Sequence, residues 1–177
     1  ILSIDSTDVF IVLSSFFWYD FDMEILFTLA VFLFSAVIHE VSHGLMAEKF
    51  GDDTAREEGR ITLNPIPHID PFGSILLPGL LLLVGSPIIF GAAKPVPVNF
   101  ANMRRQRLGM AMVSLAGPLS NLILAVLLIL PVALGVVSGT VAEFWTMAAG
   151  INVVLAVFNI LPIPPLDGSK IVASLLP

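Results

Sequence analysis

Long apolar runs, separated by short polar or proline-rich stretches, set the organisation of this chain. A helix needs about 20 mostly apolar residues to cross a bilayer, and three runs are long enough. We therefore expect an all-α polytopic membrane protein with core transmembrane helices over about residues 25–47, 108–135 and 144–161.

A fourth apolar run, over about 71–90, has a different character. Its interior prolines and glycines would interrupt a helix, among them Pro78, Gly79, Gly85 and Pro87. We expect it to enter the membrane and return as a re-entrant segment. The resulting division is an acidic, interfacial N-terminal segment at 1–24 and a membrane-embedded core at 25–177.

Composition supports the bilayer as the solvent for this chain. Among its 177 residues 56% are hydrophobic and 12% are charged, whereas a soluble domain has roughly 25% charged residues. The net charge of −6 lies mostly in the N-terminal third, and no basic face suited to nucleic acid is present. Because the chain has no cysteine, any metal must be bound by His, Asp or Glu.

A short motif near the end of the first apolar run, His39-Glu40-Val41-Ser42-His43, has the pattern HExxH. Residues four apart share one face of a helix, so the two imidazoles can bind one Zn²⁺ while Glu40 takes a proton from water. Ionisable groups inside an apolar span cost several kcal/mol unless they are paired or bind metal. The alternative is two buried histidines bonded to carbonyls, which would leave Glu40 buried without a cation.

A catalytic zinc generally has three protein ligands, so a third is needed. Asp167 follows the last apolar run in a proline-rich stretch, and irregular backbone at membrane depth is tolerated only inside protein or beside a wet cavity. From spacing alone, an ordinary turn aspartate explains Asp167 equally well. The other candidates for the third ligand are Glu48, Asp52, Asp53, His68 and Asp70.

Three ordered segments resemble the site-2 protease family of M50-type intramembrane zinc metalloproteases: 39–43, 116–121 (AGPLSN) and 159–168 (NILPIPPLDG). Residues 60–70 and 94–99 further resemble the small bacterial and archaeal branch of this family. The resemblance implies that Asp167 is the third zinc ligand and Glu40 the catalytic base. It also implies that Asn159 holds or polarises the substrate carbonyl.

The proposed ligands constrain the topology. His39 and His43 lie toward the end of the first span, and Asp167 follows the last span, so both ends must approach one membrane face. Three crossings satisfy this requirement and four do not. The polar loop on that face contains Lys94, Arg104, Arg105 and Arg107, so the positive-inside rule places the active site toward the cytoplasmic face of the cell membrane.

Two extended segments, Arg60–Asn64 and Ala93–Asn99, predict short β-strands near the active site. An unwound substrate segment could pair with them by strand addition, with Ile61, Leu63 and Val96 as contacts; alternatively, the two strands pair only with each other. Asn121 could contact the substrate or the site, or it could join two helices by hydrogen bonding.

The sequence therefore predicts a zinc endopeptidase that cleaves the transmembrane helices of other membrane proteins within the lipid bilayer. The alternative is a polytopic ion carrier or metal-binding membrane protein that uses the same buried groups for ion passage.

Overall fold

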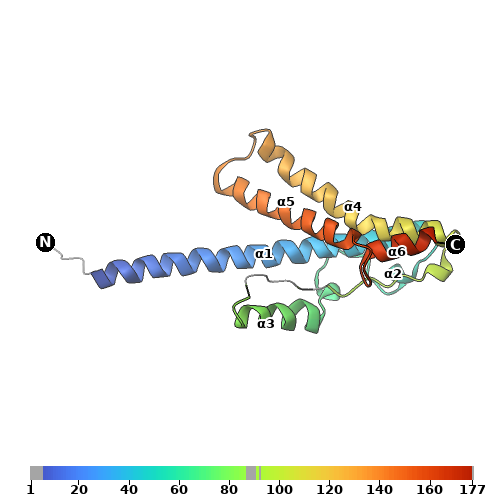
Figure 1. Cartoon of the computed structure of the whole chain (residues 1–177), viewed down its shortest axis with the longest axis horizontal. Helices are drawn as coiled ribbons and strands as arrows, with labels where there is room; N and C mark the ends of the chain where they lie inside the picture. The colour runs from blue at the N-terminus through green and yellow to red at the C-terminus, as the bar shows by residue number, and fades with distance from the viewer. Residues whose placement is uncertain (1–5, 87–90, 92, 177) are drawn as a thin grey trace.

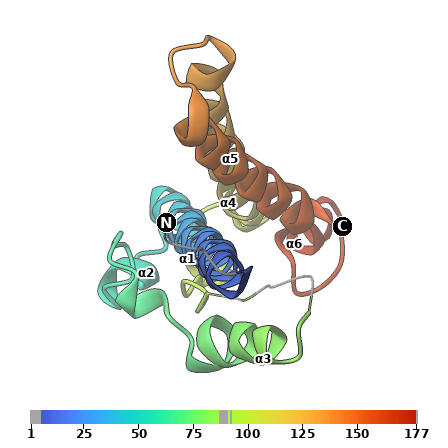
Figure 2. The ribbon, with the colours of Figure 1, turned by 90° about the vertical axis from the view of Figure 1, so that its left-hand side faces the viewer.

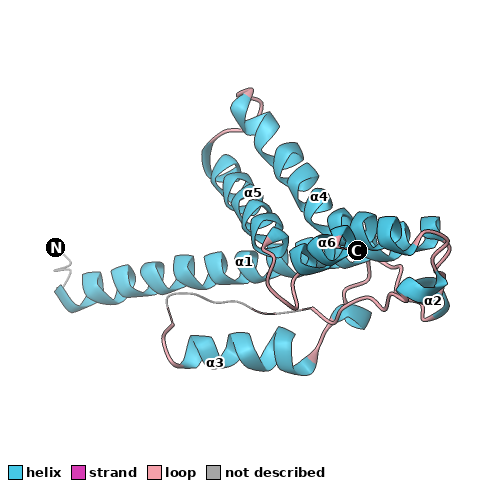
Figure 3. Ribbon diagram, turned by 45° about the vertical axis from the view of Figure 1, so that its right-hand side comes forward, coloured by secondary structure: helices cyan, strands magenta, loops and turns pink. Residues whose placement is uncertain are grey.

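The computed structural model describes residues 6–86, 91 and 93–176, with side chains from residue 23 onward, and this part of the chain is helical (Figures 1 and 3). Six α-helices are present in it: α1 (Ser6–Phe50), α2 (Thr54–Glu57), α3 (Leu77–Leu83), α4 (Gln106–Ala133), α5 (Gly139–Ile160) and α6 (Asp167–Leu175). Two short 3₁₀ helices and one π-helix complete it: η1 (Ile66–His68), η3 (Phe100–Asn102) and η2 (Pro71–Leu76).

Three helical stretches are long and apolar enough to cross a membrane, namely Met23–Phe50, Gln106–Ala133 and Gly139–Ile160. These three candidate spans overlap the three apolar runs of the sequence and indicate a multi-pass membrane protein. The first helix is longer than predicted, because α1 is continuous from Ser6. At 1.5 Å per residue its 45 residues extend about 68 Å, so the described part of the segment 1–24 continues the spanning helix.

The long helices converge at one end and separate at the other. Helices α1 and α5 run in the same direction, and α4, which lies between them in the chain, runs in the opposite direction (Figure 1). The α4–α5 pair makes a V with α1. Viewed along α1, the α4–α5 pair lies on one side of it and α3 on the other (Figure 2). The parallel course of α1 and α5 is the arrangement that three crossings require.

Small side chains form much of the buried core. The helices meet through Ala36, Ala47, Ala116, Ala125, Ala148, Ala149 and Ala156, all of which are buried. Small residues allow helices to pack closely in lipid, where the hydrophobic effect does not drive association between them. Large apolar side chains such as Leu26, Ile123, Val126 and Val154 are instead exposed, as expected for a surface in contact with lipid.

The apolar segment around α3 leaves and returns at the same place. Pro71–Leu83 forms a helical stretch of 13 residues, about 20 Å long, which is shorter than the hydrocarbon core of about 30 Å. The Lys94 N–H donates to the carbonyl of His68 at 2.8 Å, and Gly91 packs against Gly73. These contacts bring the two ends of the segment together, as a re-entrant path requires; residues 87–90 and 92 lie outside the described part.

The predicted β-strands are wrong for the residues that the structure describes. Segments 60–64 and 93–99 have no regular secondary structure, because several of their polar groups are bound elsewhere. The N–H of Val96 donates to Glu40 Oε2 at 2.7 Å, and that of Asn99 to Asp52 Oδ2 at 2.7 Å. Prolines at 95 and 97 have no N–H, and the two segments are joined by the Arg60 guanidinium, which donates to the carbonyls of Lys94 and Pro95.

Asp52 fastens the end of α1 to the chain before α4. Its side chain is fully buried, and it accepts hydrogen bonds from the Asn99 N–H, the Asn102 amide (3.0 Å) and the Thr54 hydroxyl (2.5 Å). Burial opposes ionisation of Asp52, but these hydrogen bonds outweigh it and hold the pKa of Asp52 below its usual range. The stability that Asp52 contributes is therefore present above the ordinary aspartate pKa of about 3.9 and is lost as the pH falls through the lowered value.

Replacing Asp52 with alanine should lower the free energy of unfolding by about 1–3 kcal/mol, because three donors lose their buried, charged acceptor. Thermal unfolding in detergent at neutral pH measures this loss. Asp53→Ala is the matched control, since Asp53 is exposed and its side chain caps nothing. Equal melting temperatures for the two variants would contradict the fastening role of Asp52.

Candidate metal centre

Two imidazoles and one carboxylate meet where α1, α4 and α6 converge. His39 and His43 lie one turn apart on α1, and the Nε2 atom of each is 3.1 Å from Oδ2 of Asp167. The three ligand atoms lie within 4.8 Å of one another, and all three residues are buried. Ligands about 2.1 Å from a tetrahedral zinc ion are about 3.4 Å apart, so this cluster could hold such an ion.

The other ring nitrogen of each histidine has a partner that orients the ring. His39 Nδ1 is 2.6 Å from Oδ1 of Asn121, and His43 Nδ1 is 2.6 Å from the carbonyl of Val113. Both partners belong to α4. A hydrogen bond from Nδ1–H to an oxygen leaves the lone pair on Nε2 free for a metal, and both Nε2 atoms point toward Asp167.

Asp167 reaches the cluster because α5 ends at Ile160 and α6 begins at Asp167 itself. The connecting residues 161–166 are not helical, and they turn the chain so that α6 packs against α4 and α5. Lys170, one turn along α6, donates to Asp167 Oδ1 at 3.1 Å. This contact leaves Oδ2 for the cluster and helps to balance the buried negative charge.

Gly117 on α4 leaves the space that an ion would need. A Cβ atom at this position would lie 2.5 Å from the Nε2 atoms of both His39 and His43, close to the distance expected of a bound metal. Any side chain at residue 117 would therefore occupy the coordination space. The cluster fits a metal ion both in its ligand atoms and in the volume kept open between them.

Glu40 lies beside the cluster and is held in place. It follows His39 directly, is half-buried, and accepts the Val96 N–H at 2.7 Å through Oε2. The oxygen Oε1 has no such backbone partner among the described contacts. A glutamate in this position can exchange a proton with a molecule bound between the histidines and Asp167.

Comparison with known proteins identifies the family of this chain. The profile of peptidase family M50 matches residues 134–177. The candidate zinc metalloprotease YwhC of Bacillus subtilis is 46% identical over 152 residues, which cover 81% of this chain. The chain belongs to family M50. The candidate zinc metalloproteases named Rip2 of Mycolicibacterium smegmatis and Mycobacterium tuberculosis are 36% identical to this M50 chain over 151 and 143 residues.

These M50 relatives are longer than the alignment. The chain spans 66% of the length of YwhC and 53% of each Rip2 protein, and the alignments with Rip2 cover 79% of this chain. No solved structure matches it. The family is one of zinc metalloproteases, so zinc is the metal that the buried histidine and aspartate cluster would hold.

Of the remaining candidates for a third ligand in this M50 chain, Asp53 is exposed and the others have partners elsewhere. Glu48 pairs with Arg56, Asp52 fastens the loop described above, and Asp70 accepts the Gly73 N–H at 2.6 Å. His68 is buried but bonds locally, to the carbonyl of Thr62 at 3.0 Å. Asp167 alone among the predicted candidates joins His39 and His43 in the described part of the chain.

The predicted substrate contacts are only partly brought together. Ile61 and Val96 both lie against Gly44, one turn beyond Glu40 on α1, whereas Leu63 is 62% exposed. Asn121 is fully buried and bonds to His39, so it lies behind the cluster rather than on a substrate surface. Asn159 lies in the last turn of α5 and donates to the carbonyl of Leu155 at 3.0 Å.

Sequence reasoning missed two residues of this M50 site. Asn152 on α5 is buried and hydrogen-bonded to Asn121 at 2.9 Å, and Lys170 binds Asp167. Asn152 could have been found by the same pattern as Asn121, because each is a polar amide inside an apolar span. Lys170 is three residues after Asp167, a spacing that brings opposite charges together on a helix.

Proposed function

We propose that this chain is an intramembrane zinc endopeptidase that cleaves a peptide bond in or near a transmembrane segment of other membrane proteins. One observation carries the proposal. The two HExxH imidazoles and Asp167, separated by up to 128 residues, converge at 3.1 Å, and both imidazoles belong to a helix apolar enough to span a bilayer. Glu40 adjoins this cluster, as a metalloprotease base must.

The residues divide the chemistry of peptide hydrolysis between them. A zinc ion held by His39, His43 and Asp167 would polarise the scissile carbonyl and acidify water. Glu40 accepts a proton from the attacking water and passes it to the leaving amine. Asn159, near the end of α5, is proposed to donate to the oxyanion that develops; its amide would have to leave the Leu155 carbonyl to do so.

The orientation and the substrate path are parts of the same proposal. Positive residues near the site (Lys94, Arg104, Arg105 and Arg107) favour a cytoplasmic position for this end of the bundle. A transmembrane helix satisfies its own backbone groups and must unwind before cleavage. We propose that its unwound segment lies along residues 93–99 and contacts Ile61, Leu63 and Val96, since the Val96 N–H already touches the proposed base.

Glu40→Gln should reduce cleavage by about 10²–10⁴-fold while zinc remains bound, because the variant loses the proton acceptor but keeps the ligands. Purified protein in proteoliposomes, incubated with a panel of single-span substrates, measures the rate, and elemental analysis measures zinc. Glu48→Gln is the matched control, because Glu48 lies two turns along the same helix and pairs with exposed Arg56. Ion transport by Glu40→Gln without any proteolysis by the wild type would instead support a carrier.

Asp167→Ala should remove most of the zinc and the activity together, because two imidazoles alone make an incomplete site. Equilibrium dialysis against a chelator measures the affinity, with Asp70→Ala as a control carboxylate outside the cluster. An Asp167→Ala protein with wild-type zinc content and cleavage rate would show that the third ligand lies elsewhere.

A further inference from the structure

A chain of hydrogen bonds extends from His39 through α4 to α5. Asn121 Oδ1 faces His39 Nδ1, and Asn121 Nδ2 is 2.9 Å from Asn152 Oδ1. Asn152 Nδ2 in turn is 2.9 Å from both the Ser35 hydroxyl and the Ala148 carbonyl. Asn121, Asn152 and Ser35 are all buried, so water does not compete for these bonds.

Two backbone carbonyls fix the direction of every bond in this chain. A carbonyl only accepts, so the Asn152 atom facing Ala148 O must be the nitrogen, and Oδ1 of Asn152 must face Asn121. The carbonyl of Ser35 lies 3.3 Å from Asn121 Nδ2 and imposes the same orientation. Oδ1 of Asn121 is then left for His39, whose Nδ1 must carry the proton.

We propose that Asn152 is a positioning residue for the metal centre: acting through Asn121, it holds His39 in the tautomer whose Nε2 lone pair faces Asp167. The inference rests on the proposed zinc site and adds to it a residue that contacts no ligand of the metal. If the Asn121 amide turned over, its nitrogen would face Nδ1, the proton would move to Nε2, and that nitrogen could no longer bind an ion.

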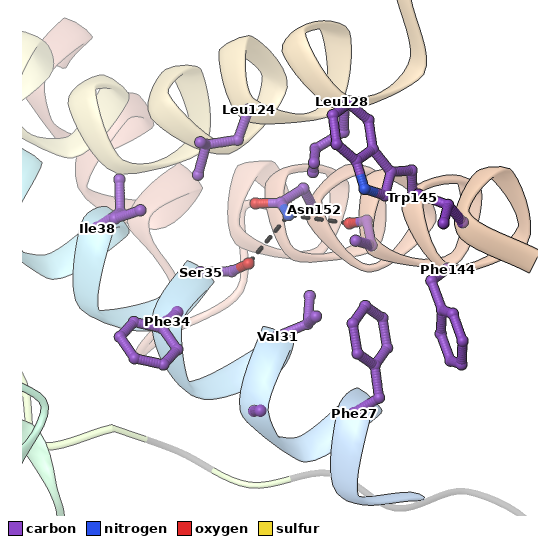
Figure 4. A pocket seen from close by; sticks show the side chains of 13 residues that line it. Phe27, Val31, Phe34, Ser35, Ile38, Leu124, Leu128, Phe144, Trp145 and Asn152 are labelled. Atoms are coloured by element: carbon purple, nitrogen blue, oxygen red, sulfur yellow. Dashed lines mark hydrogen bonds between the residues drawn. The ribbon is translucent and has the colours of Figure 1, made fainter. Parts of the chain in front are cut away.

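The surroundings of Asn152 make this orientation consequential. Asn152 and Ser35 lie at the inner end of a groove of about 580 Å³ between α1 and the α4–α5 pair, and Figure 4 shows the Asn152 amide directed at the Ser35 hydroxyl. Apart from the indole of Trp145, the other side chains that line the groove are apolar. If the Asn152 amide were turned over in this apolar groove, its hydrogen-bond donors and acceptors would be left unpaired. The free-energy penalty would be larger than in water, which could hydrogen-bond to them.

Two substitutions at residue 152 separate orientation from packing. Asn152→Leu fills a similar volume but gives Asn121 no acceptor, and we expect zinc affinity to fall about tenfold, the lower limit for outer partners of metal ligands. Asn152→Asp keeps an oxygen facing Asn121 and should retain zinc affinity within about threefold of the wild type, although it loses the bond to Ala148. Competition with a chelator measures the affinity, and the visible spectrum of the Co²⁺ form reports the ligand geometry.

The control is Thr28→Val, which removes another polar contact between α1 and α5 (Thr28 to Met147, 3.3 Å) and should leave affinity and spectrum unchanged. Wild-type zinc affinity in folded Asn152→Leu would overturn the inference, as would equal losses in the Leu and Asp variants. If Asn152→Leu does not fold, ¹⁵N NMR of the metal-free wild type decides, and a His39 ring that carries no proton on Nδ1 refutes the proposal. Absence of zinc binding by the wild type would refute the proposed function as well.

Discussion

Gly117→Ala should yield a folded protein that binds almost no zinc and cleaves nothing. The added methyl would lie 2.5 Å from the Nε2 atoms of both histidines and 2.6 Å from Cε1 of His43. It would therefore take the coordination space while leaving every ligand in the chain. Small-to-large changes in packed sites typically cost 1–3 kcal/mol, so the histidines or α4 must shift, and the loss of metal should exceed the loss of stability.

Elemental analysis and circular dichroism of the purified variant test this expectation together. Gly150→Ala is the matched control, because Gly150 lies on α5 with no atom within 4 Å of its added Cβ. The control should keep its zinc and be at least as stable, since alanine favours helix over glycine. A Gly117→Ala protein with a full complement of zinc would show that the ion does not lie between α1 and α4.

Gly168→Ala should disrupt the protein more broadly. A methyl at residue 168 would run into the carbonyl of Ile160 and lie 2.5 Å from the oxygen of Leu161. Both obstacles are backbone atoms and cannot rotate away, so α6 would have to move from the end of α5. We expect a loss of about 3 kcal/mol or more in the free energy of unfolding, together with weaker zinc binding because Asp167 moves with α6.

Thermal unfolding in detergent, with and without a chelator, measures both effects. In the wild type, a chelator should lower the melting temperature, since a metal that binds only the folded state stabilises it. In Gly168→Ala the melting temperature should be lower at the outset and respond less to the chelator. A variant as stable as the wild type, with an unchanged response, would contradict the close packing of α6 against α5.

The three long apolar helices and the pair of histidines could be predicted from sequence because each leaves a local pattern. An apolar run of about 20 residues indicates a crossing helix whatever its neighbours, and HExxH sets two imidazoles one turn apart within a single helix. Asp167 has no such local pattern. Its spacing fits a metal ligand and an ordinary turn aspartate equally well, and only the resemblance of residues 159–168 to a known family implies that it is a ligand.

Other features depend on contacts between distant segments and left no local pattern. The space beside Gly117 exists only because α4 passes within reach of His39 and His43, and the sequence around it suggests no more than close packing. The residues of segments 60–64 and 93–99 favour an extended backbone and so predict β-strands. In the structure, however, the N–H groups of Val96 and Asn99 donate to the carboxylates of Glu40 and Asp52. Extended sequences form strands only when another strand is available to accept their hydrogen bonds.

The wide sequence separation within the metal cluster has a consequence for biosynthesis. His39 and Asp167 are 128 residues apart, so a ribosome must synthesise all of α4 and α5 before it reaches the proposed third ligand. A nascent chain that has inserted α1 alone presents HExxH to the lipid without a complete site. The proposed peptidase is thus inert throughout its own insertion, when unfolded transmembrane segments, its own among them, are nearest and most vulnerable to cleavage.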